Sequence, residues 1–292
     1  MDSKSKFSHS PVMLRECVEA LVHDPSGIYV DATYGGGGHS GAILERLAAG
    51  ARLLALDADP AVRPSAACAA DARFSLHHAN FRDIDAVVEQ AGVSELAGVL
   101  MDLGVSSPQL EDPARGFSFM RAGPLDMRLD SSTGPSLAEL LARVAEPELE
   151  RLIREYGEER RARSIARRIV ALRAAGELRS TADLARACGG RRAGGVHPAT
   201  RLFLALRIWV NAELRVLEEA LRKVAALLAR NGRLVVLSFH SLEDRIVKRF
   251  IGPRSHNDGP LRRLFKARRP SAEEAAANRR ARSAMLRAAY RP

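Results

Sequence analysis

Short apolar segments alternate with helical patterns between residues 28 and 102, and this alternation constrains the fold more than any other feature of the chain. Strands are expected at 28–30, 52–56, 73–77 and 97–101, and helices at 40–49, 60–70 and 82–91 between them. A helix capped at Ser10 is expected before the first strand. Such a rhythm predicts an α/β fold with a parallel sheet and helices on both faces. Ligands of such sheets bind outside the carboxyl ends of the strands.

A run of four glycines, Gly35 to Gly38, follows the first strand and opens the helix at 40–49. Glycine lets the backbone turn tightly and approach a ligand without a Cβ in the way. We therefore interpret the run as a cofactor-binding loop. Gly37 and Gly38 must lack a side chain so that the backbone can approach the cofactor, whereas Gly35 is needed only for the turn. Taken alone, the four glycines are equally consistent with a flexible linker, because a glycine-rich turn is a weak motif.

The ends of the later strands carry groups that suit a nucleoside cofactor. Asp57 ends the second strand about 20 residues after the glycines, where an acid hydrogen-bonds ribose hydroxyls in nicotinamide and S-adenosylmethionine enzymes alike. Phe81 follows the third strand and is either a surface for adenine or a core residue. Asp102 ends the fourth strand and precedes a turn that begins at Gly104, so it is a candidate to accept a hydrogen bond from a reacting amine.

The charge of the chain favours an anionic partner. Its 292 residues carry a net charge of +10, and arginine suits phosphate because its planar fork donates two hydrogen bonds. Nucleic acid is the expected partner, although a general preference for arginine in the proteome gives the same composition. Three widely spaced cysteines predict reduced, structural thiols. No apolar run is long enough to span a bilayer, so a cytoplasmic protein is expected.

The alternating rhythm stops at Ser106. A long loop is expected at 107–135, followed by helices at 136–144, 146–156, 158–175 and 181–187. Two helices at 199–229 then lead to a buried strand at 233–239, which resumes the first sheet. A helix capped at Ser241, a basic loop at 253–282 and a last strand at 283–290 are expected to follow. We therefore divide the chain into a first part of the catalytic domain (1–108), a loop with an all-helical insertion (109–200) and a second part of the domain (201–292).

The expected helix at 158–175 has a dense basic face. Its arginines either meet RNA phosphates or form a solvated face with ion pairs between neighbouring turns. The residues concerned are Arg160, Arg161, Arg163, Arg167 and Arg168.

Six motifs resemble the bacterial RsmH (MraW) family of ribosomal small-subunit RNA (cytosine-N4)-methyltransferases. They occur in the order of that family, and the resemblance extends from about His9 to Arg287. The motifs are DATYGGGGHS (31–40), MDLGVSSPQL (101–110), RGFSFMR (115–121), YGEER (156–160), HPATR (197–201) and SFHSLEDR (238–245).

The resemblance implies a Class I S-adenosylmethionine-dependent methyltransferase fold, Rossmann-like, with a helical insertion that recognises RNA. It implies N4-methylation of a cytidine in the decoding centre of 16S ribosomal RNA, within the small ribosomal subunit, by a monomer or weak homodimer. It also assigns the cofactor-binding residues. Gly37, Gly38 and His39 would hold the methionine end of S-adenosylmethionine, Asp57 its ribose and Phe81 the adenine surroundings, and Asp102 and Gln109 would complete the site.

Methyl transfer to an exocyclic amine needs alignment and a hydrogen-bond acceptor, and it needs no metal. Asp102 and the backbone at Ser106 are the catalytic candidates, and either Asp102 or solvent takes the proton. His240, at the end of the resumed strand, either touches the target base or is a satisfied strand-end histidine. Two other classes stay open: a dinucleotide-dependent oxidoreductase, and a non-catalytic RNA-binding or ribosome-assembly factor.

Overall fold

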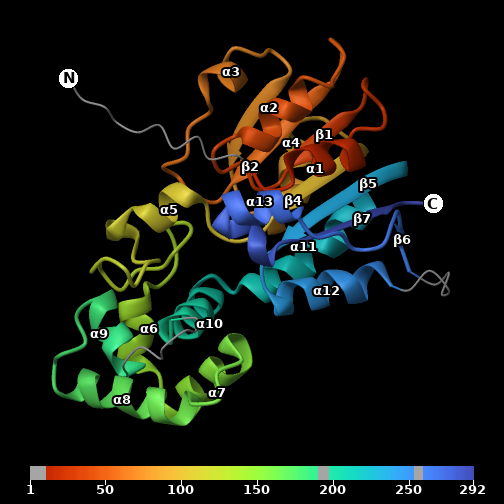
Figure 1. The fold of residues 1–292 in the computed structure, drawn as a ribbon. Helices are drawn as coiled ribbons and strands as arrows, with labels where there is room; N and C mark the ends of the chain where they lie inside the picture. Colours follow the sequence, from red (N-terminus) through yellow and green to blue (C-terminus); the bar gives the residue numbers. More distant parts are fainter. Residues whose placement is uncertain (1–10, 190–196, 253–258) are drawn as a thin grey trace. The chain divides into compact units, whose positions relative to one another are not determined.

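The computed structural model describes residues 11–189, 197–252 and 259–292, which form two compact units. The first unit comprises the chain up to Gly104 together with Val216–Pro292, and the second comprises Val105–Arg215. Each unit is described on its own (Figure 1).

The first unit is built on a seven-stranded sheet in the order β3-β2-β1-β4-β5-β7-β6. Strands β1 to β5 are parallel, and β7 is antiparallel to both of its neighbours. This order confirms the Class I S-adenosylmethionine-dependent methyltransferase fold, Rossmann-like and mostly parallel. The strands are β1 (Ile28–Asp31), β2 (Arg52–Asp57), β3 (Phe74–His78), β4 (Leu96–Asp102), β5 (Leu228–Ser238), β6 (Arg262–Arg263) and β7 (Met285–Tyr290).

Helices cover both faces of this sheet, because successive side chains of a strand point to opposite faces. In β1, for example, Val30 belongs to one hydrophobic core and Tyr29 to the other. The core that contains Val30 is closed by α4 (Ile84–Gln90), α11 (Glu213–Leu227) and α12 (Ser241–Ile251). The core that contains Tyr29 is closed by α1 (Leu14–Leu21), α2 (Gly38–Leu44) and α3 (Ala66–Ala69).

Several helices of the first unit begin at a different residue from the one expected. Helix α2 begins at Gly38 and not at Ser40, so the last glycine lies inside the helix. The expected helix at 60–70 shrinks to α3, because prolines lie at Pro60 and Pro64 and the helix is capped only at Ser65. Helix α1 begins at Leu14, after Met13 in a left-handed conformation, and the expected cap at Ser10 lies outside the described residues.

The C-terminal segment contains more structure than the basic loop that the sequence predicted for 253–282. Its described part includes β6, helix α13 (Ala272–Ala277) and a 3-10 turn at Arg279–Ser283, before β7 confirms the expected last strand. The carboxylate of Glu274 accepts a hydrogen bond from the backbone N–H of Met13 at 2.7 Å. This segment therefore folds back onto the N-terminal part of the first unit.

The second unit contains helices joined by loops and no strand among its described residues, as expected for the insertion. A short helix, α5, lies within the region expected to be a loop, and α10 packs on α7. The second unit thus includes α10, whereas the sequence-based boundary at residue 200 grouped α10 with the catalytic domain. The helices are α5 (Ser107–Glu111), α6 (Leu137–Arg143), α7 (Glu146–Gly157), α8 (Ala162–Ala174), α9 (Thr181–Ala187) and α10 (Ala199–Asn211).

All three cysteines, Cys17, Cys68 and Cys188, are free and buried, as the sequence predicts. Among the described residues, no helix combines the length and apolar character that crossing a bilayer requires.

Candidate active site

Asp31, at the end of β1, anchors both ends of the glycine loop. Its Oδ2 accepts a hydrogen bond from the Ser40 hydroxyl at 2.7 Å, and its Oδ1 accepts one from the Thr33 backbone N–H at 3.2 Å. The side chain is fully buried, and burial raises its pKa. Asp31 was not among the predicted site residues, although an acid at a strand end shortly before the glycines was a usable signal.

The glycine loop is shaped by the protein's own packing. Gly37 has φ +76°, and a Cβ there would lie 2.3 Å from the Tyr34 hydroxyl oxygen. A Cβ at Gly38 would lie 2.2 Å from Pro11 Cγ, whereas one at Gly36 would meet nothing within 4 Å. Gly37 is therefore constrained by the packing of Tyr34 before any cofactor is considered, and a side chain at this position is expected to strain the loop. Gly36, in contrast, faces open space.

Asp57 lies beside the glycine loop, as its place at the end of β2 predicts. Its Oδ2 accepts a hydrogen bond from Gly35 N–H at 2.7 Å, and its Oδ1 accepts one from Asp59 N–H at 2.9 Å. Burial raises the pKa of this carboxyl. Each carboxylate oxygen can accept further bonds, so Asp57 retains acceptor capacity for ribose hydroxyls.

A cavity of about 450 Å³ adjoins Asp57. Its apolar lining includes Val62 and Phe74, a surface suited to a flat ring. Phe81, in contrast, is half-buried and packs against the core on the α4 side of the sheet, which favours its core role.

His39 and Asp102 face each other at the carboxyl end of the sheet. His39 is buried, its Nε2 lies 3.2 Å from the Val12 carbonyl oxygen, and its Nδ1 lies 3.6 Å from Asp102 Oδ2. Burial lowers the pKa of His39 and raises the pKa of Asp102 to about 7. Near neutral pH Asp102 is therefore poised to gain or lose a proton.

Asp102 Oδ1 has no hydrogen-bond partner among the described residues, although it is buried. The carboxylate as a whole keeps 20% of its side-chain surface exposed. Buried polar atoms are nearly always paired, so an orphaned acceptor at the edge of an α/β sheet indicates a place for a ligand with an N–H donor.

Two charges from late in the chain act on Asp102. Arg280 lowers the pKa of Asp102 against the larger effect of burial, and Glu243 raises it. Arg280 belongs to the 3-10 turn before β7, and its guanidinium carbon lies 5.6 Å from the centre of the Phe239 ring. Sequence reasoning missed Arg280, because nothing in the basic tail distinguishes it from its neighbours.

His240 caps helix α12. Its Nδ1 accepts from Glu243 N–H at 3.5 Å, so the cap lies one residue before Ser241, where the sequence placed it. Its Nε2 lies 3.0 Å from Glu243 Oε1, outside hydrogen-bonding geometry. These contacts favour the structural interpretation of His240, and a contact with the target base stays a prediction.

The remaining predicted site residues, Ser106 and Gln109, belong to the second unit. Ser106 caps α5, and its backbone N–H donates to Gln109 Oε1 at 2.9 Å. Gln109 is buried. The structure thus gathers the predicted residues of the first unit, other than Phe81, around Asp102 and the glycine loop, and it describes Ser106 and Gln109 next to one another.

The basic face of α8 is only partly neutralised. Arg161 lies 3.5 Å from a carboxylate oxygen of Glu159, and Arg168 donates to the Ala187 carbonyl oxygen at 3.3 Å. Arg163 and Arg167 are exposed, and neither is bonded to any residue that the structure describes. The alternative interpretation, a solvated face with ion pairs between neighbouring turns, therefore does not apply to Arg163 and Arg167.

Comparison with known proteins is consistent with this geometry. The MraW methylase family matches residues 6–291. A ribosomal RNA small subunit methyltransferase H from Chromohalobacter salexigens is 49% identical over 99% of this chain and 93% of its own. One from Methylibium petroleiphilum is 50% identical over 98% and 96%, respectively. The solved structure of an rRNA methylase from Streptococcus thermophilus covers 95% of this chain and 93% of its own with 11% identity and a TM-score of 0.40, too distant to add to the family match.

Proposed function

Because the chain belongs to the MraW methylase family, we propose that this S-adenosylmethionine-dependent methyltransferase modifies N4 of a cytidine in the decoding centre of 16S ribosomal RNA. Relatives about half identical over nearly their whole length are named ribosomal RNA small subunit methyltransferases, which supports the choice of RNA. The cytosine amine as target rests on the family resemblance and on the acceptor that Asp102 offers. Nothing in the site favours a hydride-transfer reaction or a purely structural role.

The single observation that carries the proposal is the orphaned Oδ1 of Asp102. S-adenosylmethionine supplies a methyl group on a positively charged sulfur, which is already activated for transfer. Asp57 would accept hydrogen bonds from the ribose, and the cavity beside it would hold the adenine. Both the methionine ammonium group and the cytosine amine can donate to Asp102, so the residues present suit the cofactor and the proposed substrate.

Asp102 has the chemistry that the cytosine amine requires. The lone pair of this amine is drawn into the ring, so the nitrogen becomes nucleophilic only when an acceptor helps it become tetrahedral. A carboxyl whose pKa is about 7 accepts a hydrogen bond and then a proton near physiological pH. His39 lies on the other side of the carboxyl, with its Nδ1 3.6 Å from Oδ2.

Recognition of RNA is assigned to the second unit. The exposed Arg163 and Arg167 on α8 are one helical turn apart and present two guanidinium groups to the same side. Such groups bind phosphates and make affinity dependent on salt. The expected partner is the small ribosomal subunit that contains the 16S RNA.

The test is transfer of a labelled methyl group to small ribosomal subunits that lack the modification, followed by identification of the methylated nucleoside. N4-methylcytidine at one position is the expected product, and labelling of another base or of protein would contradict the proposal. Asp102→Asn separates the two roles of Asp102. If it acts on the amine, single-turnover methylation falls by at least about a hundredfold while S-adenosylhomocysteine affinity changes little. A loss confined to cofactor affinity would assign Asp102 to the cofactor alone.

A further inference from the structure

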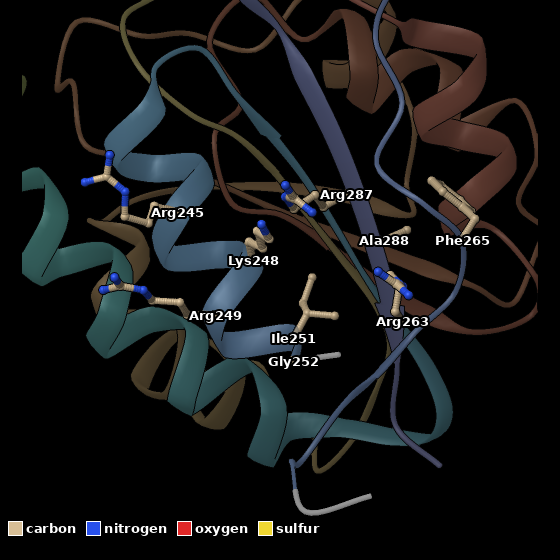
Figure 2. Close-up of a pocket in the computed structure, with 9 residues that line it drawn as sticks. All are labelled: Arg245, Lys248, Arg249, Ile251, Gly252, Arg263, Phe265, Arg287 and Ala288. Atoms are coloured by element: carbon tan, nitrogen blue, oxygen red, sulfur yellow. The ribbon is translucent and has the colours of Figure 1, made fainter. Parts of the chain in front are cut away.

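A cavity of about 570 Å³ opens at the β6 edge of the sheet, and we call it the α12 cavity (Figure 2). Its volume is in the range of pockets that hold small molecules or single nucleotides. The residues come from α12, β6, β7 and the segments beside them. They are Arg245, Lys248, Arg249, Ile251, Gly252, Arg263, Phe265, Arg287 and Ala288.

The α12 cavity is strongly cationic. Five of its described lining residues are arginine or lysine, and none of the residues that line it is acidic. Arg287 is neutralised by Asp244, through contacts of 2.6 Å and 2.9 Å between the guanidinium and the carboxylate. Lys248 and Arg249 are exposed neighbours on one turn of α12, and neither side chain is hydrogen-bonded or ion-paired to a residue in the described part of the chain. The cavity therefore keeps uncompensated positive charge at its rim.

Arg263 gives a second indication that the α12 cavity binds an anion. Its Nε is buried and has no hydrogen-bond partner among residues 11–189, 197–252 and 259–292. Leaving a buried charged donor unpaired costs free energy, so an acceptor that the described residues do not supply is expected to complete the site. Ile251 and Phe265 contribute apolar walls, which strengthen attraction between the charges and offer packing surface for a sugar or base.

The register of the sheet separates the α12 cavity from the candidate active site. Arg263 pairs with Ala289, Ala289 with Leu234, and Leu234 with Val99, which is three residues before Asp102. With strands about 4.8 Å apart and a rise of about 3.3 Å per residue, the backbones of Arg263 and Asp102 are about 17 Å apart. The cavity is thus a different site on the same rigid sheet.

We propose that the α12 cavity is a second RNA-binding site, where Lys248, Arg249 and Arg263 bind backbone phosphates of single-stranded substrate RNA. Single-stranded RNA suits a cationic hollow with an apolar wall, because its phosphates and its unstacked bases are both accessible. The inference rests on the proposed function for the identity of the RNA. It adds a contact that fixes the strand on the first unit, away from the transferred methyl group.

The test measures binding of labelled 16S RNA, free of protein, across a series of salt concentrations. The variant carries Lys248→Gln with Arg249→Gln, and the matched control carries Arg46→Gln with Arg52→Gln, two exposed arginines at the amino end of β2 and its preceding turn. Loss of two phosphate contacts should lower the slope of log affinity against log salt by about 1.4 and weaken binding up to about 25-fold at 0.1 M salt. The control variant should have the same salt slope and the same RNA affinity as the wild type.

Calorimetry with S-adenosylhomocysteine shows whether each variant is folded, because the changed residues lie outside the cofactor site. An unchanged salt slope in the α12 variant would overturn the proposal. So would a defect that appears with assembled small subunits and not with protein-free RNA, because the cavity would then bind a ribosomal protein. If the wild type methylates no ribosomal RNA but the α12 variant still loses RNA affinity, the proposed function fails and the RNA-binding site stands.

Discussion

Replacing Asp102 by asparagine removes a buried carboxyl whose pKa burial raises from 3.8 to about 7. The unfolded chain releases this proton near pH 4, whereas the folded protein keeps it until about pH 7. The free energy of unfolding of the first unit therefore falls as the pH rises through this window and levels off above it. The rise in pKa corresponds to roughly 4 kcal/mol in total, of which about 2 kcal/mol is lost between pH 5 and pH 7.

Asp102→Asn should abolish this part of the pH dependence, because asparagine has a similar shape and does not ionise. The variant should be more stable than the wild type at pH 8, and its advantage should shrink by about 2 kcal/mol between pH 7 and pH 5. Hydrogen exchange of the β1 and β4 amides measures the stability of the first unit directly.

The single tryptophan, Trp209, lies in α10 of the second unit, so its fluorescence provides an internal control that should not respond to the substitution. Equal pH dependence of β1 and β4 exchange in the wild type and the variant would refute the reasoning. It would mean that Asp102 is already ionised at pH 5 and that its buried oxygen is stabilised by something other than a proton.

The other predictions concern the glycine loop and α8. Gly37→Ala should lower the unfolding free energy by at least about 1 to 2 kcal/mol, because it strains a positive φ and displaces Tyr34. Gly36→Ala should be nearly neutral. Thermal unfolding compares the two variants, and equal losses of stability would contradict the packing argument. Replacing both Arg163 and Arg167 by glutamate should lower the salt slope of RNA binding by at least about 1.4 and leave the affinity for S-adenosylhomocysteine unchanged. An unaltered slope would show that α8 does not contact RNA.

Much of the fold follows from local sequence. The alternation of apolar segments with helical patterns places β1 to β4 close to where the structure has them, because the period of buried residues is a property of each segment alone. Strand β5 begins at Leu228 and not at 233, and β6 was not expected. The two helices expected in 199–229 are present as α10 and α11, but the left-handed Ala212 between them, with φ 48°, has no signal in the sequence. Helix starts were less predictable. His240 caps α12 one residue before the expected Ser241, because the choice between adjacent caps depends on the backbone direction at the end of the preceding strand.

The sequence by itself also determined which residues are candidates for the site, because strand ends of a parallel sheet meet at one edge and Asp57 and Asp102 end their strands there. Only the tertiary structure determined the hydrogen bonding, burial and electrostatic surroundings of these residues. The lone acceptor of Asp102, its raised pKa, the approach of Arg280 from the tail and the contact that a Cβ at Gly38 would make with Pro11 all depend on residues distant in the chain. The α12 cavity is likewise invisible in the sequence, because burial and electrostatic surroundings depend on long-range contacts.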